Sequence, residues 1–357
     1  MSRLSHSQVL FRYACIALTL AALAAAFAWT AGWIHWPGAQ AALTSSRLID
    51  AFERSAGKHP GFRRNHAKGI CVSGYFDSNG NGAALSRASV FERGRTPLIG
   101  RFSAPGGNPA EEDANTTVRS FALLFAMRDG EQWRTGMNSA PVFAVRTPQA
   151  VYELQEAMQN DERTGRPDAA KLNAFFAQHP ETNALRDWLA AHPPASEFYN
   201  ASYYSIDAFR FTSASGDVRF VRWSVVPDAL YAPVDTRSPN ASDPDFLAHG
   251  LRVRLQSGPV SWHLMLTPAG AGDPVDDATR AWPAERERHR VDAGTIVIDH
   301  AQAQIDGACR DINFDPTVLP VGIAPSDDPL LAARAAAYAV SFDRRTSEET
   351  QAGVKGH

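Results

Sequence analysis

The residues from Tyr13 to Ile34 carry no charged side chain and are mostly alanine and leucine. Roughly 20 apolar residues are enough to cross the hydrocarbon core of a bilayer. Trp29, Trp33 and Trp36 fall towards the far end of the run, and tryptophan favours the membrane interface. We therefore expect residues 13–36 to be a transmembrane anchor or a signal segment, with a buried core helix as the alternative.

The charges around this run predict its orientation. Arg3 and Arg12 precede it, and no Lys or Arg follows before Arg47, so the positive-inside bias places residues 1–12 in the cytoplasm. Ala39-Gln40-Ala41 has the small-x-small pattern of a signal peptidase site, although the apolar run is longer than the roughly 7–15 residues of a signal core. We expect a periplasmic body, anchored to the inner membrane or released by cleavage near Ala41.

The composition beyond this run is that of an ordinary globular protein, with 44% hydrophobic and 20% charged residues. A net charge of -3 and the absence of a basic run give no reason to expect a nucleic-acid partner. Of three cysteines, Cys15 lies in the apolar run, which leaves Cys71 and Cys309 as a possible pair in an oxidising compartment. Spacing alone does not decide whether they form a disulfide.

Short apolar runs separated by turn residues predict strands and hairpins in the body. The predicted strands are residues 69–75, 209–212, 218–226, 251–255, 260–266 and 295–298. The two pairs 209–212 with 218–226 and 251–255 with 260–266 are each joined by a turn that contains glycine, as in a β-hairpin.

Capping residues and prolines predict helices between and after these strands. The first follows Thr44 and ends at Gly57, two more cover residues 168–177 and 181–191, and the last begins at Asp328-Pro329 and stops near Ser341. Many antiparallel strands with clustered helices indicate an α+β fold around a barrel or curled sheet. No repeat or linker divides residues 43–348, so we expect one domain there and a flexible tail at 349–357.

One motif points to a known family. The stretch HPGFRRNHAKGICVSGYF at residues 59–76 resembles the catalase signature, in which a His-Ala-Lys-Gly motif carries the distal histidine over the haem. Further catalase-like blocks follow in the same order. They are Gly100-Arg101-Phe102-Ser103, Arg119-Ser120-Phe121-Ala122, Met137-Asn138-Ser139-Ala140-Pro141-Val142-Phe143, INFDPTVLPVGI at residues 312–323, and Arg334-Ala-Ala-Ala-Tyr338. A catalase-like antiparallel β-barrel core with surrounding helices is what this resemblance implies.

The resemblance also implies roles around haem iron. Tyr338 would be the iron ligand, and Arg334, four residues before it on the same helix face, can donate to the phenol oxygen. Tyrosine is the known axial ligand of catalases. His66 would be the distal acid/base, Asn138 an amide donor to the developing charge on the peroxide, and Ser103 the support of His66.

The remaining cofactor contacts follow from the same blocks. Arg63, Arg101 and Arg345 would pair with the haem propionates, a task suited to guanidinium groups. Phe143 matches a phenylalanine of the haem pocket. The implied cofactor is one haem b per subunit.

The chain is short for a catalase and ends soon after Arg345. It is similar in this respect to the minimal catalase-related peroxidases, which implies reduction of organic hydroperoxides, and more weakly of hydrogen peroxide, by a small-molecule reductant through a ferryl haem. Asn65 stands where catalase has a valine that narrows its channel, and Ala144 and Val151 stand where it has bulky phenylalanines, so we expect a wider entrance.

Three alternatives stay open. The chain could be a small catalase that dismutates hydrogen peroxide, a fatty-acid hydroperoxide lyase like the allene oxide synthases, or a haem carrier or sensor without turnover. A mere carrier needs neither His66 nor Asn138, and their joint presence favours an enzyme.

Overall fold

The computed structural model describes residues 6–30, 42–235, 242–283 and 289–355. The chain divides into two compact units, Met1–Thr44 and Ser45–His357.

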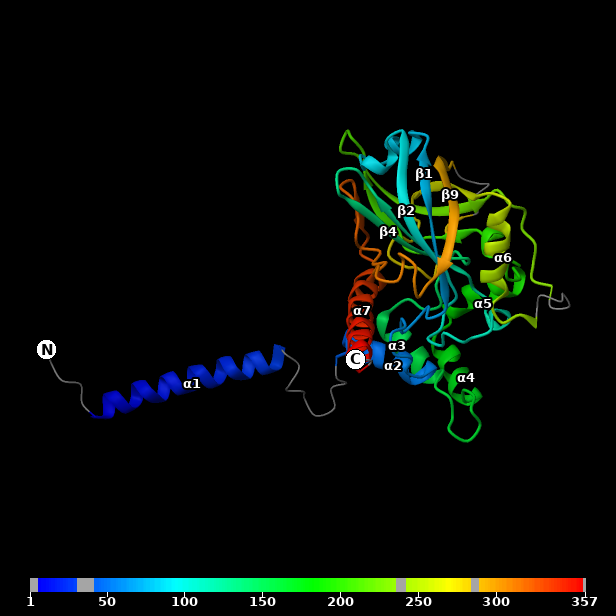
Figure 1. Ribbon diagram of the computed structural model, residues 1–357. Helices are drawn as coiled ribbons and strands as arrows, with labels where there is room; N and C mark the ends of the chain where they lie inside the picture. Colours follow the sequence, from blue (N-terminus) through cyan, green and yellow to red (C-terminus); the bar gives the residue numbers. More distant parts are fainter. Residues whose placement is uncertain (1–5, 31–41, 236–241, 284–288, 356–357) are drawn as a thin grey trace. The chain divides into compact units, whose positions relative to one another are not determined.

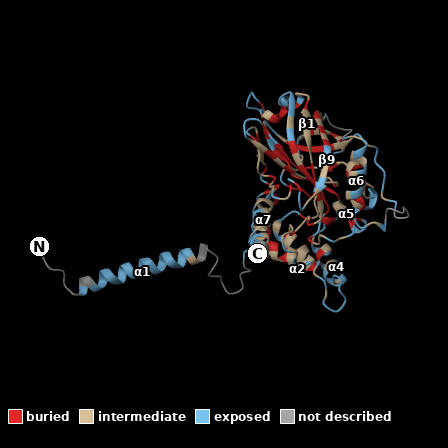
Figure 2. Ribbon diagram, viewed as in Figure 1, coloured by how far each residue is buried: buried red, intermediate tan, exposed pale blue. Residues whose placement is uncertain are grey.

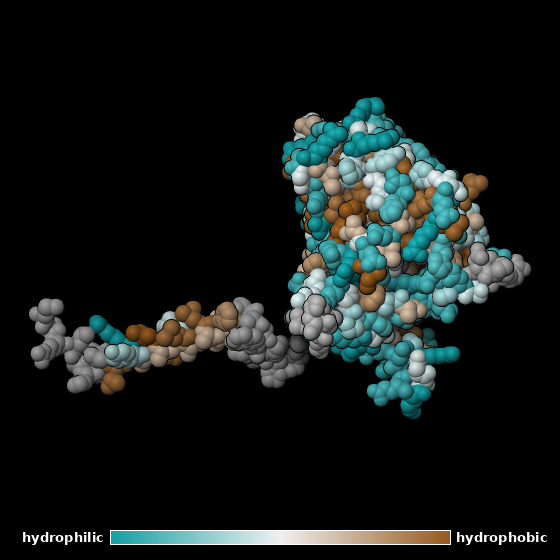
Figure 3. Space-filling model, viewed as in Figure 1, coloured by the Kyte–Doolittle hydropathy of each residue, from teal (hydrophilic) through white to brown (hydrophobic). Residues whose placement is uncertain are grey.

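The first unit holds one long helix, α1 (His6–Thr30). Its stretch Leu10–Ala28 is long and apolar enough to cross a membrane, and none of that stretch is buried by the protein. Hydrophobic side chains lie along the helix surface (Figure 3), among them Leu10, Phe11 and Phe27. A signal sequence fits the same description, so this helix is compatible with either an anchor or a signal segment. The predicted cleavage site Ala39-Gln40-Ala41, like Trp33 and Trp36, lies outside the described residues.

The second unit is built on a β-barrel (Figure 1). Its strands are β1 (Gly69–Ser78), β2 (Gly94–Ser103), β3 (Ser120–Ala126), β4 (Gln132–Asn138), β5 (Tyr203–Tyr204), β6 (Phe209–Thr212), β7 (Val218–Pro227), β8 (Val260–Pro268), β9 (Val291–Ala303) and β10 (Ile323–Pro325). Their order is β10-β6-β7-β5-β4-β3-β2-β1-β9-β8, and β7 also pairs with β8. This last pairing closes an antiparallel barrel of eight strands, which β6 and β10 extend at the side. The catalase-like α+β fold predicted from the sequence is confirmed.

Alternation along the strands separates the inside of the barrel from its outside. In β4 and β8 every second residue is buried. The inward side chains form one large core that is rich in aromatic rings, and Figure 2 shows buried residues concentrated in the strands. Phe102 of β2 stacks on Phe121 of β3 with ring centroids 4.1 Å apart. The core therefore fills the barrel and leaves the outer face for other contacts.

Helices cover the outside of the barrel. They are α2 (Ser45–Ala56), α3 (Pro148–Ala157), α4 (Ala169–Gln178), α5 (Thr182–Ala191), α6 (Phe246–Gln256) and α7 (Pro329–Lys355). α2 contacts both α3 and α7, and these helices gather at one end of the barrel (Figure 1). The predicted helices after Thr44, at 168–177 and at 181–191 are confirmed, as is the hairpin of β6 and β7.

Two predictions on secondary structure are wrong. Residues 251–255 are not a strand, because they belong to α6, whose buried Leu247 and Leu251 lie four residues apart on one helix face. The last helix does not stop near Ser341 but continues to Lys355, so residues 349–355 are helical where a flexible tail was expected. Ion pairs from Arg64 to Glu348 at 2.5 Å and from Arg310 to Glu349 at 2.9 Å hold this extension against the rest of the unit.

Candidate functional site

The predicted site residues meet on the outer face of β2, β3 and β4. The strand register forms two rows there: Ser103, Ser120 and Asn138 are neighbours in the first row, and Arg101, Ala122 and Gly136 in the second. Alternation explains why these residues share a face while Phe102 and Phe121 between them point into the barrel. Sequence blocks that lie far apart in the chain are therefore brought to one surface.

His66 lies just before β1 in an unusual backbone conformation. Its φ is 57°, in the left-handed region that non-glycine residues seldom adopt. The Asn65 side-chain oxygen stabilises this turn, since it accepts hydrogen bonds from the amides of His66 at 2.9 Å and Gly106 at 2.8 Å. The Nδ1 of His66 lies 3.4 Å from the Ser103 hydroxyl. Nε2 is thus the ring nitrogen left for a ligand.

The surroundings keep the His66 ring neutral. Burial, followed by the charges of Arg101, Arg334 and Arg63, lowers the pKa of His66 from its ordinary value to about 3. A neutral imidazole can accept a proton at Nε2, which is the requirement for a general base at neutral pH.

Asn138 is oriented by a neighbour in its own row. The Ser120 hydroxyl donates a 2.7 Å hydrogen bond to the Asn138 side-chain oxygen. With the oxygen occupied, the amide nitrogen of Asn138 remains as a donor toward the cavity.

Tyr338 lies on α7 with its phenol oxygen 3.5 Å from Nη2 of Arg334, which also donates to the Gly136 carbonyl at 3.3 Å. The other side of the Arg334 fork binds the buried Asp207 carboxylate. Although burial alone would lower the pKa of Arg334, Tyr338 and Asp207 raise it above its ordinary value. A permanent cation therefore lies beside the phenol oxygen, the atom through which a tyrosine binds a ferric ion.

Three further arginines contact the same cavity without a carboxylate partner. Arg101 and Arg345 are each 2% exposed, and among the described residues no ion pair involves either of them or Arg63. Burial and the charge of Arg345 lower the pKa of Arg63 to about 9, and burial lowers that of Arg345. Within the described part of the chain, Nη2 of Arg345 also lacks a hydrogen-bond partner. Buried, unpaired cations of this kind fit a ligand that brings two carboxylates.

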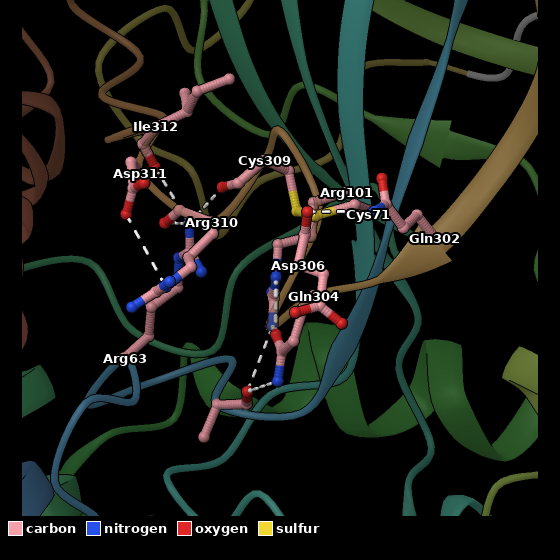
Figure 4. The surroundings of a disulfide bond; sticks show 11 residues. Arg63, Cys71, Arg101, Gln302, Gln304, Asp306, Cys309, Arg310, Asp311 and Ile312 are labelled. Carbon is pink, nitrogen blue, oxygen red and sulfur yellow. Dashed lines mark hydrogen bonds and ion pairs between the residues drawn. A yellow bond between two sulfur atoms is a disulfide. The ribbon is translucent and has the colours of Figure 1, made fainter. Parts of the chain in front are cut away.

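A loop after β9 holds two of these arginines in place (Figure 4). Nη2 of Arg63 donates to the carbonyls of Cys309 at 2.9 Å and Ile312 at 2.9 Å. The Gln304 side-chain oxygen accepts from Nη2 of Arg101 at 2.6 Å. Cys309 of this loop forms a disulfide with Cys71 of β1, which answers the pairing question that the sequence left open.

All nine predicted site residues line one cavity: Arg63, His66, Arg101, Ser103, Asn138, Phe143, Arg334, Tyr338 and Arg345. About 1300 Å³ between the lining atoms is free of protein, the open mouth included. Much of the remaining wall is apolar, with Leu48, Ile49 and Phe52 contributed by α2. Val151 also lines the cavity, whereas Ala144 packs against the neighbouring cluster of α3 and α4.

Sequence reasoning missed three residues that orient the site. Ser120 stood in a recognised block but had no role, and only the strand register reveals that it faces Asn138. Asp207 and Gln304 carried no local signal, because each bonds an arginine that is more than a hundred residues away in the chain.

Comparisons with known proteins agree with this geometry. The family model described as catalase matches residues 38–352. A catalase-related peroxidase of Synechococcus elongatus is 35% identical over 304 residues, which cover 85% of this chain and 89% of that protein. Another, from Mycolicibacterium paratuberculosis, is 32% identical over 85% of this chain and 95% of its own length. Catalase A from Saccharomyces cerevisiae has a similar fold, with a TM-score of 0.73 at 21% identity, and the match covers 87% of this chain but only 66% of that larger protein.

Proposed function

Since this chain belongs to the catalase family and is a haem peroxidase of the catalase superfamily, we propose that it reduces organic hydroperoxides in preference to hydrogen peroxide. The proposal includes haem b as the cofactor and a small molecule as the electron donor. When bound, the haem supplies the iron at which the peroxide O–O bond is cleaved.

The residues of the cavity fit such a cofactor. Arg63, Arg101 and Arg345 would bind its two propionates, because these buried guanidinium groups have no carboxylate of their own among the described residues. Tyr338 would bind the iron through its phenol oxygen, which Arg334 contacts at 3.5 Å. Phe143 would pack against the macrocycle.

His66 and Asn138 would act on the hydroperoxide. Nε2 of the neutral His66 would accept the proton of the hydroperoxide O–H and return it to the departing oxygen, which leaves as an alcohol. The Asn138 amide would donate to the oxygen on which charge develops. Ser103 and Ser120 would keep the two side chains in these orientations.

The preference for organic peroxides rests on one observation. The cavity is lined by Leu48, Ile49, Phe52 and Val151 in addition to the polar groups, and apolar side chains favour the carbon skeleton of an organic hydroperoxide. Hydrogen peroxide gains nothing from such a wall.

The test compares two activities of the haem-loaded full-length chain. Oxidation of an aromatic donor with tert-butyl hydroperoxide should exceed the release of oxygen from hydrogen peroxide. Vigorous oxygen release would make the protein a small catalase, and consumption of the hydroperoxide without any donor would make it a lyase. The variant Tyr338→Phe serves as the control for activity of loosely bound haem.

A further inference from the structure

The connection between β9 and β10 reaches the cofactor site although it contains no helix or strand. Residues 304–322 form this connection. Long irregular segments in a compact domain are uncommon, and they often carry function. Its first part, residues 304–312, supplies the groups that hold Arg63 and Arg101. The orientation of both arginines therefore depends on where this segment lies.

Arg63 binds the middle of the segment. Arg63 donates through the same Nη2 to three carbonyls, those of Cys309, Arg310 and Ile312, at 2.9 to 3.3 Å. Burial lowers the pKa of Arg101, and the nearby charges of Arg63 and Arg345 lower it further. Like charges repel, so this cluster needs an outside constraint until an anion binds.

Hydrogen bonds attach the two ends of this part of the segment. The Gln304 side-chain amide donates to the Ala67 carbonyl at 2.9 Å, and Arg134 of β4 donates to the Asn313 carbonyl at 2.6 Å. Between these ends, the amides of Asp306, Arg310 and Ile312 each bond a carbonyl three residues earlier, which shapes turns but does not attach them to the barrel. The attachment to β1 is covalent, through Cys71 and Cys309, which are 3% and 0% exposed. Cys71 is the register partner of both Arg101 and Gln302, so the disulfide lies beside the residue whose guanidinium Gln304 holds (Figure 4).

The chain packs tightly around the sulfur atoms of the disulfide. A Cβ on Gly307 would lie 2.5 Å from the Cys71 sulfur, so only glycine lets the segment approach this closely. Beyond the disulfide, Ile312 and Phe314 pack against Leu124 and also line the cavity. The same short segment thus links the disulfide, the arginines and the cavity wall.

We propose that the Cys71–Cys309 disulfide is a positioning element of the cofactor site, and that the chain takes up its carboxylate-bearing porphyrin with full affinity only after this bond forms. The inference rests on the proposed function. Formation of the bond removes two protons and two electrons from the thiols, and a disulfide-bearing oxidoreductase accepts them as its own disulfide opens to a dithiol. Loading would then be coupled to an oxidising compartment.

The experiment measures porphyrin binding instead of catalysis. The full-length chain in detergent, with Cys15→Ser to remove its exposed free thiol, is titrated with iron-free protoporphyrin IX and with its dimethyl ester, which lacks the carboxylates. Oxidised protein, protein reduced with a dithiol, and the double variant Cys71→Ala/Cys309→Ala are compared. Arg101→Gln in the oxidised protein serves as the reference for loss of one guanidinium.

We expect the reduced protein and the double variant to bind the free acid about 10- to 100-fold more weakly, the usual effect of losing groups that orient a site, while binding of the ester changes little. Equal affinity of oxidised and reduced protein for the acid would overturn the proposal. An equal loss for both porphyrins would also overturn it, since the disulfide would then stabilise the fold without orienting the arginines. Each protein sample is judged by the ratio of its affinity for the free acid to its affinity for the ester. Partial unfolding lowers both affinities and therefore does not imitate the expected result.

Failure of the proposed function would look different. An oxidised chain that binds the acid tightly but oxidises no donor with any hydroperoxide would refute the peroxidase and leave the positioning disulfide intact.

Discussion

At the scale of single residues, the neutrality of His66 makes a prediction about pH. Its pKa is about 3 in the folded protein, below the ordinary value of 6.5, so the folded state binds fewer protons than the unfolded state between these values. Stability from this group is fully present above pH 6.5 and is lost as pH falls toward 3. We expect kcat/KM for tert-butyl hydroperoxide to show no acid limb near pH 6.5. A limb with its midpoint there would mean that His66 titrates normally.

Removal of the ring tests its role directly. His66→Ala should lower kcat/KM by about 10²- to 10⁴-fold, the range typical of a general acid/base, without weakening porphyrin binding. Ser103→Ala should have a smaller effect of the same kind, because the ring loses only its 3.4 Å neighbour. Stopped-flow measurement of peroxide consumption separates these effects from donor oxidation. An unchanged rate in His66→Ala would exclude it as the base.

Tyr338→Phe removes only the phenol oxygen from the wall of the cavity. We expect affinity for haem to fall at least about tenfold, which corresponds to 1.4 kcal/mol. The affinity for iron-free protoporphyrin should stay the same, because the arginines that would hold the propionates are untouched. Absorbance titrations with the two ligands make the comparison. If both affinities fall together, Tyr338 supports the pocket without binding iron.

The residues of the site could be predicted from the sequence to an uneven degree. His66, Ser103, Asn138 and Tyr338 stand in short blocks whose order along the chain carries the information. Asp207 could not be found this way, because its bond to Arg334 spans 127 positions and nothing local marks it. Side chains that orient others through long-range contacts are visible only after the barrel closes.

At the scale of elements, features set by the local sequence are again easier to predict than features that depend on long-range contacts. The β6–β7 hairpin is predictable from the sequence because its turn residues and strand periodicity agree locally. The sequence does not predict α6, because a short apolar run is compatible with both a strand and a helix, and burial against the barrel decides between them. The end of α7 depends on partners such as Arg64 that lie at the other end of the unit.

The extension of α7 makes a paired prediction. Arg64 is buried and binds both oxygens of Glu348, at 2.5 and 3.0 Å, so Glu348→Gln should lower the free energy of unfolding by about 1–3 kcal/mol. The neighbouring pair of Glu349 and Arg310 is more exposed, and Glu349→Gln should cost under about 1 kcal/mol. Urea unfolding of the two variants provides the comparison. A cost of under about 1 kcal/mol for Glu348→Gln as well would show that the end of α7 contributes little to the fold.

At the scale of the whole molecule, two structural features are compatible with export of the barrel unit. A helix of apolar side chains precedes the barrel unit, and the barrel unit itself holds a disulfide, which forms and persists in oxidising surroundings. We propose that the chain is exported by means of this N-terminal anchor or signal segment. The positive charges before the apolar run predict the matching orientation, with residues 1–12 in the cytoplasm and the barrel unit outside it.

This orientation can be tested in a Gram-negative bacterium that expresses the full chain. We expect the protein in the membrane fraction, released by detergent but not by alkaline carbonate, and degraded by protease added to spheroplasts. Any soluble fraction should come from the periplasm and should disappear in the variant Ala39→Leu/Ala41→Leu, because large residues at both small positions block signal peptidase. A soluble fraction that persists in this variant would place the cut elsewhere. Protease resistance in spheroplasts together with free thiols at Cys71 and Cys309 would place the barrel unit in the cytoplasm, and the link between disulfide formation and cofactor loading would then have no compartment in which to operate.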